Sequence, residues 1–418
     1  SGRGGTRVLS LDLSIRNSHL LNMIFRGFTY RLEPTGEQHK TMLEFAGVCR
    51  LIWNLSLEQR INHWRQYQRT TGDNLNFVTQ ARQLKDLRAT FDFIKAVSQE
   101  SQQRTMKNLD TAFVRFFKGQ GGFPKFKKAG VGDSFSFMGR NVRVEKLNAK
   151  WSRVKLPKLG WIKFRCTRPV EGSIREATVT RTSLGWQVSI GCLIDRDVED
   201  VGGAVGIDRG VAVPLMLSDG TSYSLPESIA RLDKKHKRLQ RIASRRKRGS
   251  KRHRKAIQRA AKVKAKQARI RKDWVHRGTT EIARQYGTVV VERLRTQNMT
   301  KRAKLKGVAQ KRGLNRAILN VGWHQIETML AYKAFDFQKV DPAYTSQTCS
   351  SCGTVDSRSR KSQASFVCTA CGFRENADLN AAINILNRGN TAVLDVEVGQ
   401  SVVSCEASTS VSAEIPAL

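Results

Sequence analysis

The amino-acid sequence predicts an all-β module that carries a helical insertion, followed by an α/β domain. Three observations lead to this fold class. Short strand-like runs separated by Gly and Pro fill residues 123–200, apolar runs that end in an acidic residue alternate with helical stretches beyond residue 201, and two Cys-x-x-Cys pairs lie toward the C-terminus. Evenly spaced short strands are typical of a small barrel, and alternating strands and helices are typical of an α/β sheet.

The first module is expected to interrupt its strands with helices. Residues 23–33 alternate apolar and polar side chains, as a half-buried strand does. Two stretches with apolar residues near helical spacing, 36–66 and 76–118, follow this strand, and glycines within 119–122 end the second stretch. The β module then resumes at 123–200, so the helices form an insertion within it.

The second half is expected to alternate strands with helices. Strand-like runs are predicted at 204–208, 211–217, 221–225, 288–292 and 339–340, and helical stretches at 228–286, 315–336 and 378–388. Ser218-Asp219-Gly220 separates the second run from the third and is typical of a hairpin turn.

The charge of the chain indicates a polyanionic partner. Over 418 residues, 74 Lys and Arg stand against 35 Asp and Glu, which gives a formal net charge of +39. A compact fold with this excess repels itself unless a polyanion neutralises it. We therefore expect a nucleic-acid partner whose affinity falls steeply as salt rises.

A membrane segment is not expected, because no run of 18 apolar residues occurs. Residues 1–22 contain apolar pairs, but Asp12, Arg16 and Asn17 interrupt any signal-peptide core. Met23 opens the first clean strand. We expect Met23 to be the natural start and residues 1–22 to be an added or disordered leader.

Four of the eight cysteines are predicted to hold one zinc ion. Cys349-Ser-Ser-Cys352-Gly and Cys368-Thr-Ala-Cys371-Gly are two like knuckles separated by 15 residues. Each turn presents two thiolates, and Zn²⁺ takes four such ligands in a tetrahedron. Because protein ligands fill all four positions, the zinc ion is expected to brace the fold rather than to act in catalysis. The other four cysteines are scattered singly, which fits a reducing compartment.

Three acidic residues are predicted to form a catalytic metal site. Asp208 and Glu292 each end an apolar strand, and Asp378 opens a helical stretch just after the second knuckle. Singly, each acid could be a turn or cap residue. Together they follow the layout of an RNase H-like sheet, with acids on a first strand, on a later strand and on a closing helix. Three converging carboxylates can hold two Mg²⁺ ions about 3.5–4 Å apart.

The motifs that contain these residues resemble those of the transposon-encoded TnpB family. The three acids lie in Gly206-Ile-Asp208-Arg-Gly210, Val290-Val-Glu292-Arg-Leu294 and Asp378-Leu-Asn380-Ala-Ala382-Ile-Asn384, which resemble the RuvC motifs of that family. Further matches, in family order, are Gly122-Phe-Pro-Lys-Phe126-Lys127, Leu156-Pro-Lys-Leu-Gly-Trp161, Arg245-Arg-Lys-Arg-Gly-Ser250, Gly322-Trp323 and Thr345-Ser-Gln-Thr-Cys349. They run from about residue 25 to 390.

The resemblance implies a specific domain organisation. A wedge-type β-barrel is expected at 23–35 and 120–200, carrying a helical recognition domain at 36–119. A RuvC-like nuclease domain is expected at 201–343 and 373–395, interrupted by a zinc ribbon at 344–372. Residues 396–418 are expected to form a mobile tail.

The resemblance also implies an RNA-guided DNA endonuclease. Such a protein binds a noncoding guide RNA from the transposon end and reads a short motif beside the target in double-stranded DNA, while base pairing reads the rest. Asp208, Glu292 and Asp378 then become catalytic ligands of two Mg²⁺ ions in phosphodiester hydrolysis. We expect a monomer on one RNA rather than a dimer, in the cytoplasm of a prokaryote and associated with the nucleoid.

One departure from the family pattern precedes the last acid. The family often places His-Asp-Arg there, whereas this chain has Glu375-Asn376-Ala377. Loss of the arginine beside Asp378 is expected to weaken substrate positioning without removing a metal ligand. The zinc ribbon, seven residues earlier, is expected to position Asp378.

Two basic segments are predicted to contact nucleic acid. From Arg231 to Lys272 there are 21 Lys or Arg and one acid, Asp233, although a solvated helical hairpin or a targeting signal would share this composition. The expected phosphate contacts are Arg245, Arg246, Lys247, Arg248, Lys251, Arg252 and Arg254. In the second segment Lys125, Lys127 and Lys128 are expected to face RNA, with Phe123 and Phe126 as core anchors rather than base-stacking platforms.

Three other functions fit parts of the pattern. A miniature type V CRISPR effector nuclease shares these motifs, and the sequence of the bound RNA would distinguish it. A nuclease-dead, RNA-guided DNA-binding regulator is the second alternative, and the intact acidic triad argues against it. The third is a conventional transposase that acts without RNA.

Overall fold

The computed structural model describes residues 23–68, 75–196, 198–301, 307–362 and 364–399, and side chains as far as residue 390. The chain divides into two compact units, Ser1–Asp197 and Val198–Leu418, each with its own apolar core. The predicted leader and residues 400–418 of the predicted tail lie outside the described residues.

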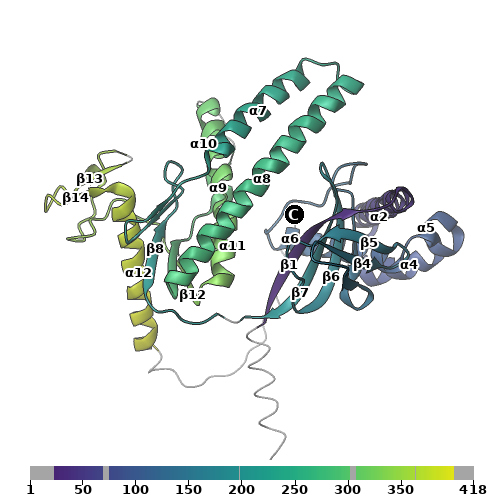
Figure 1. The fold of residues 1–418 in the computed structure, drawn as a ribbon, viewed down its shortest axis with the longest axis horizontal. Helices are drawn as coiled ribbons and strands as arrows, with labels where there is room; N and C mark the ends of the chain where they lie inside the picture. Colours follow the sequence, from purple (N-terminus) through teal and green to yellow (C-terminus); the bar gives the residue numbers. More distant parts are fainter. Residues whose placement is uncertain (1–22, 69–74, 197, 302–306, 363, 400–418) are drawn as a thin grey trace, which may run out of the picture. The chain divides into compact units, whose positions relative to one another are not determined.

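The first unit is built on a seven-stranded antiparallel sheet in the order β2-β6-β7-β1-β5-β4-β3; Figure 1 labels five of these strands, β1 and β4 to β7. Its strands are β1 (Met23–Glu33), β2 (Ser134–Met138), β3 (Arg143–Lys146), β4 (Trp151–Leu156), β5 (Gly160–Arg165), β6 (Ser173–Thr182) and β7 (Gly185–Asp195), with a 3-10 turn η2 (Gly139–Asn141). Strand β1 pairs with β7 through Arg31 and then with β5 from Leu32 onward. The shared strand makes both halves of the sheet contribute to one core.

The predicted barrel is open along one side. Within the described strands, β2 and β3 form the two edges of the sheet and do not pair with each other. Helix α2 packs against this sheet, where the rings of Phe45 and Phe135 lie 5.3 Å apart between centroids. One face of the insertion thus completes the core that the strands leave open.

The helical insertion consists of α2 (Gly36–His63), a π-helical turn η1 (Trp64–Gln68), α4 (Phe77–Thr90), α5 (Asp92–Ala96) and α6 (Gln99–Phe117). The predicted single stretch 76–118 is therefore three helices, because Phe91 adopts extended backbone angles between α4 and α5, and Val97 does so after α5. Helix α2 begins with a capping box, in which the Thr35 hydroxyl accepts from the Gln38 N–H and the Gln38 side chain accepts from the Thr35 N–H.

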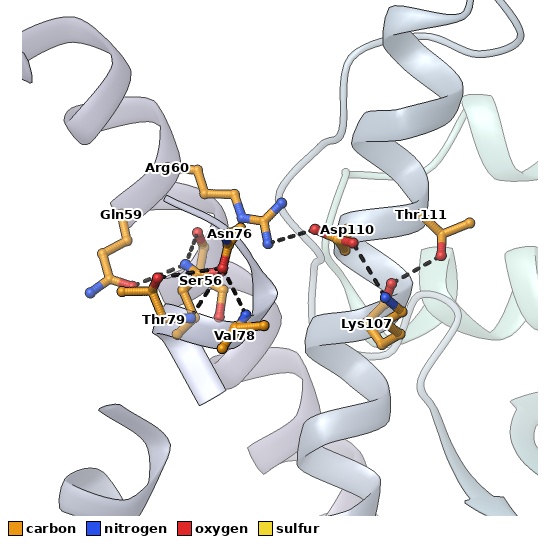
Figure 2. Close-up of polar contacts among 10 residues, drawn as sticks. Ser56, Gln59, Arg60, Asn76, Val78, Thr79, Lys107, Asp110 and Thr111 are labelled. Carbon is orange, nitrogen blue, oxygen red and sulfur yellow. Dashed lines mark hydrogen bonds and ion pairs between the residues drawn. The ribbon is translucent and has the colours of Figure 1, made fainter. Parts of the chain in front are cut away.

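Polar contacts hold the inserted helices together (Figure 2). Arg60 of α2 pairs with Asp110 of α6 at 3.2 Å. Gln80 of α4 donates to the Ser56 carbonyl at 2.9 Å. The Asn76 side chain accepts from the N–H groups of Val78 and Thr79 and so begins α4.

The second unit contains a five-stranded mixed sheet in the order β10-β9-β8-β11-β12. The strands are β8 (Ala204–Asp208), β9 (Leu215–Leu217), β10 (Ser222–Tyr223), β11 (Thr288–Glu292) and β12 (Asp336–Val340). Strands β8, β11 and β12 are parallel, and β9 and β10 are antiparallel additions. This sheet confirms the predicted α/β organisation of the second half.

Helices connect and cover this sheet (Figure 1). They are α7 (Glu227–Ser244), α8 (Lys251–Gln285), α9 (Thr296–Met299), α10 (Val308–Val321), α11 (Trp323–Lys333) and α12 (Ala377–Gly399), with a 3-10 turn η3 (Ser357–Ser359) and a small hairpin of β13 (Ser365–Val367) and β14 (Arg374–Asn376). The predicted helix 315–336 is two helices, because Gly322 takes a left-handed φ of 83° between α10 and α11. None of the helices in the described ranges has the length and apolar character that a membrane crossing requires.

Helix α12 lies unusually close to the sheet at Gly206 of β8. A Cβ atom at Gly206 would lie 2.6 Å from the Leu386 nitrogen and would also overlap the Ala382 carbonyl oxygen. Only glycine therefore fits at this point of the strand. The close approach fixes the start of α12, and with it Asp378, relative to β8.

Candidate active site and metal centre

Strands β8 and β11 bring two of the predicted acids to the same edge of the sheet. The strands run parallel, and Ile207 pairs with Val291. Asp208 and Glu292 are the next residues of their strands, so both acids lie at the carboxyl ends of β8 and β11. Asp378 stands in the first turn of α12, which packs on β8. Glu292 and Asp378 are buried, and Asp208 is partly buried. The three carboxylates thus come from three neighbouring elements, β8, β11 and α12.

The carboxylates repel one another in this environment. The pKa of Asp208 is raised to about 7, chiefly by burial and in addition by the negative charges of Glu292 and Asp378. Burial also raises the pKa of Glu292 and of Asp378. The guanidinium of Arg360 acts in the opposite direction, because its positive charge lowers the pKa of each of the three. A site of this kind stabilises added positive charge.

Contacts from neighbouring segments hold Glu292. The Thr345 hydroxyl donates to Glu292 Oε1, and Arg209 Nη2 donates to the Glu292 backbone carbonyl. Arg209 is itself buried and pairs with Glu327 of α11 at 3.2 Å. Glu327 also pairs with Lys339 of β12. Strands β8, β11 and β12 and helix α11 are therefore joined beside the acidic edge.

Asp378 is held from two sides. The Asn376 side chain accepts from the Asp378 N–H at 2.9 Å and from the Leu379 N–H at 3.3 Å, which starts α12. Arg360 Nη2 lies 3.2 Å from Asp378 Oδ1. Arg360 belongs to the cysteine segment, so this segment supplies a cation beside the last acid although Ala377 precedes it.

The three carboxylates do not form a tight cluster in this structure. Among the described residues, only the four cysteines form a group of three or more candidate ligands whose donor atoms all lie within 4.8 Å of one another. Asp378 is directed to Arg360, and Glu292 to Thr345. The donors are nevertheless hard carboxylate oxygens, the type that Mg²⁺ and Mn²⁺ prefer. The residue types therefore fit a divalent hard cation.

The four predicted zinc ligands do converge. Cys349 Sγ lies 3.8 Å from Cys371 Sγ, and Cys352 Sγ lies 3.6 Å from Cys368 Sγ. A tetrahedron with Zn–S bonds of about 2.3 Å has sulfur–sulfur edges of about 3.8 Å. The observed spacing therefore fits Zn²⁺ held by four thiolates.

The two knuckles share one backbone pattern. In the first, the Cys349 N–H donates to the Thr354 carbonyl at 2.9 Å, and the Gly353 N–H donates to the Cys349 carbonyl at 2.9 Å. In the second, Cys368 and Gly372 make the equivalent bonds at 2.9 Å and 3.1 Å. Both glycines have left-handed φ angles, 75° and 71°, which explains why glycine follows each Cys-x-x-Cys pair.

Two asparagines join α12 to the first knuckle. Asn380 accepts from the Ser350 N–H at 2.9 Å and donates to the Thr348 carbonyl at 2.8 Å. Asn384, one turn later, donates to the carbonyls of Thr345 and Thr348 at 3.0 Å and 2.7 Å. Both side chains are buried. The helix that carries Asp378 is thus bonded directly to the segment that begins the cysteine cluster.

The predicted phosphate contacts of the second unit lie at one end of a helical hairpin. Residues 245–250 form the turn between α7 and α8, and the positions expected to contact phosphate are exposed there and in the first turn of α8: Arg245, Arg246, Lys247, Arg248, Lys251, Arg252 and Arg254. Within the hairpin, Ile229 and Ala243 of α7 are buried, as are Ala256 and Ala260 of α8. Few apolar side chains are buried along the hairpin, and the cations are left for solvent or a ligand.

The basic segment of the first unit differs in part from its prediction. Lys125 and Lys128 are exposed, but Lys127 Nζ lies 4.0 Å from the centroid of the Trp53 ring, and burial lowers the pKa of Lys127. The prediction that Phe123 and Phe126 are core anchors is wrong, because both rings are about half exposed. Main-chain hydrogen bonds anchor the segment in their place, from Trp53 and Asn54 to the carbonyls of Lys125 and Lys127.

Sequence reasoning missed several residues beside the acids. Arg209, Thr345, Asn380 and Asn384 lie inside the family motifs given above. The motifs therefore marked these positions, but the sequence alone did not indicate what each side chain contacts. Arg360 carried no local signal, because it is 18 residues from Asp378 and only the fold of the cysteine segment brings the two together.

Three family models match parts of the chain. A model described as "Probable transposase" (OrfB_IS605) matches residues 187–303, and one described as "Cas12f1-like, TNB domain" matches residues 323–385. A third, described as "Helix-turn-helix domain", matches residues 23–69, which contain strand β1 and helix α2 in this structure.

Two relatives span nearly the whole chain. A protein of Escherichia coli K12 named "Putative RNA-guided DNA endonuclease InsQ" is 34% identical over 390 residues, which cover 90% of this chain and 95% of the relative. A protein of Streptomyces pristinaespiralis with the same descriptive name is 29% identical over 400 residues, 89% of this chain and 91% of the relative.

A solved structure shares the fold. The protein chain in a cryo-EM structure of a Cas12f1–sgRNA–target DNA complex is 16% identical, with a TM-score of 0.56, and the match covers 88% of this chain and 99% of that one. The predicted resemblance is therefore confirmed at the level of the family. With 34% identity to InsQ along almost its full length, the chain belongs to the TnpB family of RNA-guided DNA endonucleases.

Proposed function

We propose that the chain is an RNA-guided DNA endonuclease that binds a noncoding guide RNA, recognises a short motif beside its target and cleaves DNA by Mg²⁺-dependent phosphodiester hydrolysis. The observation that carries this proposal is that Asp208 and Glu292 end the paired strands β8 and β11, with Asp378 close enough for its charge to raise the pKa of Asp208. The full-length similarity to relatives named as RNA-guided DNA endonucleases supports the same activity.

The domain assignment follows from this proposal. Residues 23–35 and 120–200 serve as the wedge-type β module and 36–119 as the recognition helices. Residues 201–343 and 373–395 serve as the RuvC-like nuclease domain, and 344–372 as its zinc ribbon. The described part of α12 extends to Gly399, four residues past the proposed end of the nuclease domain.

The acidic residues hold the catalytic cations in this proposal. Asp208, Glu292 and Asp378 are the Mg²⁺ ligands, and bound Mg²⁺ supplies an activated water and a counter-charge for the leaving oxygen. Arg209 and Thr345 hold the backbone and side chain of Glu292, and Arg360 holds Asp378. These contacts restrict Glu292 and Asp378 before substrate arrives, which lowers the cost of assembling the site.

The zinc ribbon has a structural role in this proposal. One Zn²⁺ bound to Cys349, Cys352, Cys368 and Cys371 leaves no open ligand position. Its contribution to cleavage is indirect, because the same segment supplies Arg360 and is bonded to Asn380 and Asn384 of α12.

The nucleic-acid partners are a guide RNA and double-stranded DNA. The exposed cations at the α7–α8 turn provide phosphate contacts, and the phosphates of a nucleic acid neutralise the net charge of +39. We further propose a monomer on one RNA, acting at the nucleoid of a prokaryotic cytoplasm.

Co-purified RNA and a cleavage assay test the proposal. The full-length protein is purified, its bound RNA is sequenced, and a plasmid matching the guide portion is incubated with the complex and Mg²⁺. We expect RNA from the transposon end and cleavage that EDTA abolishes. A repeat-spacer RNA would favour the CRISPR effector, and a preparation that contains no RNA would contradict guidance altogether.

A pair of acid variants tests the assignment of the active site. Asp208→Ala should abolish cleavage while the complex still binds its target. Asp273→Ala serves as the matched control, since Asp273 lies exposed on α8 and pairs with Arg277, one turn later on the same helix, at 3.0 Å. Cleavage by the Asp208 variant would refute the acidic site, and binding without cleavage by the wild type would refute the enzyme.

A further inference from the structure

A cluster of phenylalanines lies exposed at the end of α6. Phe117, the last residue of the helix, is 78% exposed, and Phe123, which follows the glycines, is 45% exposed. The Phe123 ring stands at 90° to Phe113 and at 87° to Phe116, with centroids 5.6 Å and 5.3 Å away. Phe117 lies against the same two rings, at 6.3 Å and 5.4 Å. The rings form one continuous aromatic surface, which we call the α6 platform.

The α6 platform is rigidly supported. Phe113 packs on the small core of Trp53, Leu57 and Leu109 below it. On the far side, the segment after Phe123 is bonded to α2 through Trp53 Nε1, which donates to the Lys125 carbonyl at 3.0 Å, and through Asn54, which exchanges two bonds with Lys127 at 3.0 Å and 2.8 Å. The exposed rings are therefore held in place before any ligand binds, which reduces the entropy lost on binding.

The residues around the α6 platform are positively charged, which favours a negatively charged partner. Residues 111–132 contain five Lys or Arg and no Asp or Glu. Arg115, Lys118 and Lys125 are all exposed beside the rings in sequence. A Cβ atom at Gly122 would meet nothing within 4 Å, so the space next to Phe123 is open. The nearest acid on α6, Asp110, is paired with Arg60. Exposed rings among exposed cations suit unpaired nucleotides, because bases stack on aromatic faces while cations contact the phosphates.

We propose that the α6 platform stacks unpaired bases of the guide RNA. This inference rests on the proposed function for the identity of the RNA. Exposed aromatic surface of this kind favours aggregation unless a partner covers it. The guide RNA is bound before DNA arrives and stays bound, whereas the target strand becomes paired with the guide. The RNA is therefore the partner able to cover the rings permanently.

Binding measurements on ring variants test this inference. The probes are the RNA recovered from the purified complex and the same sequence synthesised as single-stranded DNA. Phe117→Ala with Phe123→Ala should weaken RNA binding about tenfold or more, the scale of one lost stacking partner. Because stacking involves no phosphate, the slope of log affinity against log salt should stay unchanged. Phe117→Tyr with Phe123→Tyr keeps the ring faces and should restore affinity.

Matched controls separate stacking from folding. Phe93→Ala is the control variant, because Phe93 lies on α5, outside the α6 platform, and is 55% exposed. We expect this variant to bind RNA with wild-type affinity. Ultraviolet crosslinking of the wild-type complex should place nucleotide adducts on the peptide that contains Phe117 or Phe123, without any variant. Melting curves of the variants show whether the ring changes disturb the fold.

Each outcome decides the matter. Wild-type RNA affinity in the double alanine variant, together with no adduct on these peptides, would overturn the α6 platform while leaving the proposed function intact. Weaker binding of the DNA probe alone would overturn its assignment to RNA. A purified protein without any RNA would remove the proposed function, and this inference with it.

Discussion

Adding one methyl group at Gly206, as in Gly206→Ala, should move Asp378 of α12 away from Asp208 of β8. In Gly206→Ala the new Cβ would lie 2.6 Å from the Leu386 nitrogen and 2.9 Å from the Leu386 Cβ, where ordinary contact begins at 3.4 Å. Both strand β8 and helix α12 have rigid backbones at this point. Helix α12 must therefore retreat by about 0.8 Å from the nitrogen contact alone.

The retreat acts on both stability and cleavage. Overpacking of this kind costs about 1–3 kcal/mol of the free energy of unfolding. Because Asp378 lies in the first turn of α12 and Asp208 ends β8, the same shift moves one carboxylate away from the other. A displacement near 1 Å at reacting groups lowers the rate by about 100-fold. We expect the cleavage rate to fall by this factor while guide RNA binding is retained.

Single-turnover plasmid cleavage with saturating Mg²⁺ measures the rate, and a thermal melt measures stability. Gly313→Ala is the matched control, because Gly313 lies in α10 and a Cβ there would meet nothing within 4 Å. This control should cut normally and melt at the same temperature or slightly higher. A Gly206→Ala protein that cuts at the wild-type rate would refute the argument that the contact of α12 with β8 positions Asp378.

Four other changes test separate parts of the structure. Arg209→Met should lower the melting temperature, because it leaves Glu327 without its buried partner and removes a donor to the Glu292 backbone; an unchanged melt would contradict this. Cys371→Ala should lower the zinc content measured by atomic absorption and reduce cleavage, and a fully active, zinc-bearing variant would show that the ribbon is not needed. With EDTA present, the raised pKa of Asp208 means that its carboxyl takes up a proton more readily in the folded than in the unfolded protein, so its contribution to stability is full below about pH 4 and is lost as pH rises toward 7. The melting temperature of Asp208→Asn should therefore depend less on pH over this window than that of the wild type. An equal pH dependence of the two melting temperatures would refute this. The four exposed cations of the α7–α8 turn are Arg245, Arg246, Lys247 and Arg248. Replacing all four with alanine should reduce the slope of log affinity against log salt for RNA or DNA by up to about four, without changing the melting temperature. An unchanged slope would exclude this turn from phosphate contact.

Several features could be predicted from the sequence because short segments determine them. The two Cys-x-x-Cys-Gly knuckles need only a tight turn with a left-handed glycine, so Cys349 and its three partners come together as predicted. The runs that end in Asp208 and Glu292 predict buried strands, and these strands lie beside each other in parallel. The α/β order of the second half follows from the same local patterns.

Other predictions were less exact where tertiary contacts compete with local preference. The stretch 76–118 reads as one helix, but the structure breaks it around Phe91 and Val97 as the insertion folds back on itself. Phe123 and Phe126 are apolar and therefore predicted to be buried, yet main-chain bonds to α2 anchor their segment and leave the rings exposed. Composition cannot distinguish a buried ring from one displayed on a supported surface.

The sequence by itself determined which residues carry the chemistry: four thiols for zinc, three acids for a hard cation, and an excess of positive charge for nucleic acid. Only the tertiary structure decided how these residues are held. Arg360 reaches Asp378 across 18 residues, Thr345 reaches Glu292 across 53, and α12 approaches Gly206 closely enough to exclude any side chain. Such contacts depend on the path of the backbone through space, and residues far apart in the chain leave no local pattern that records them.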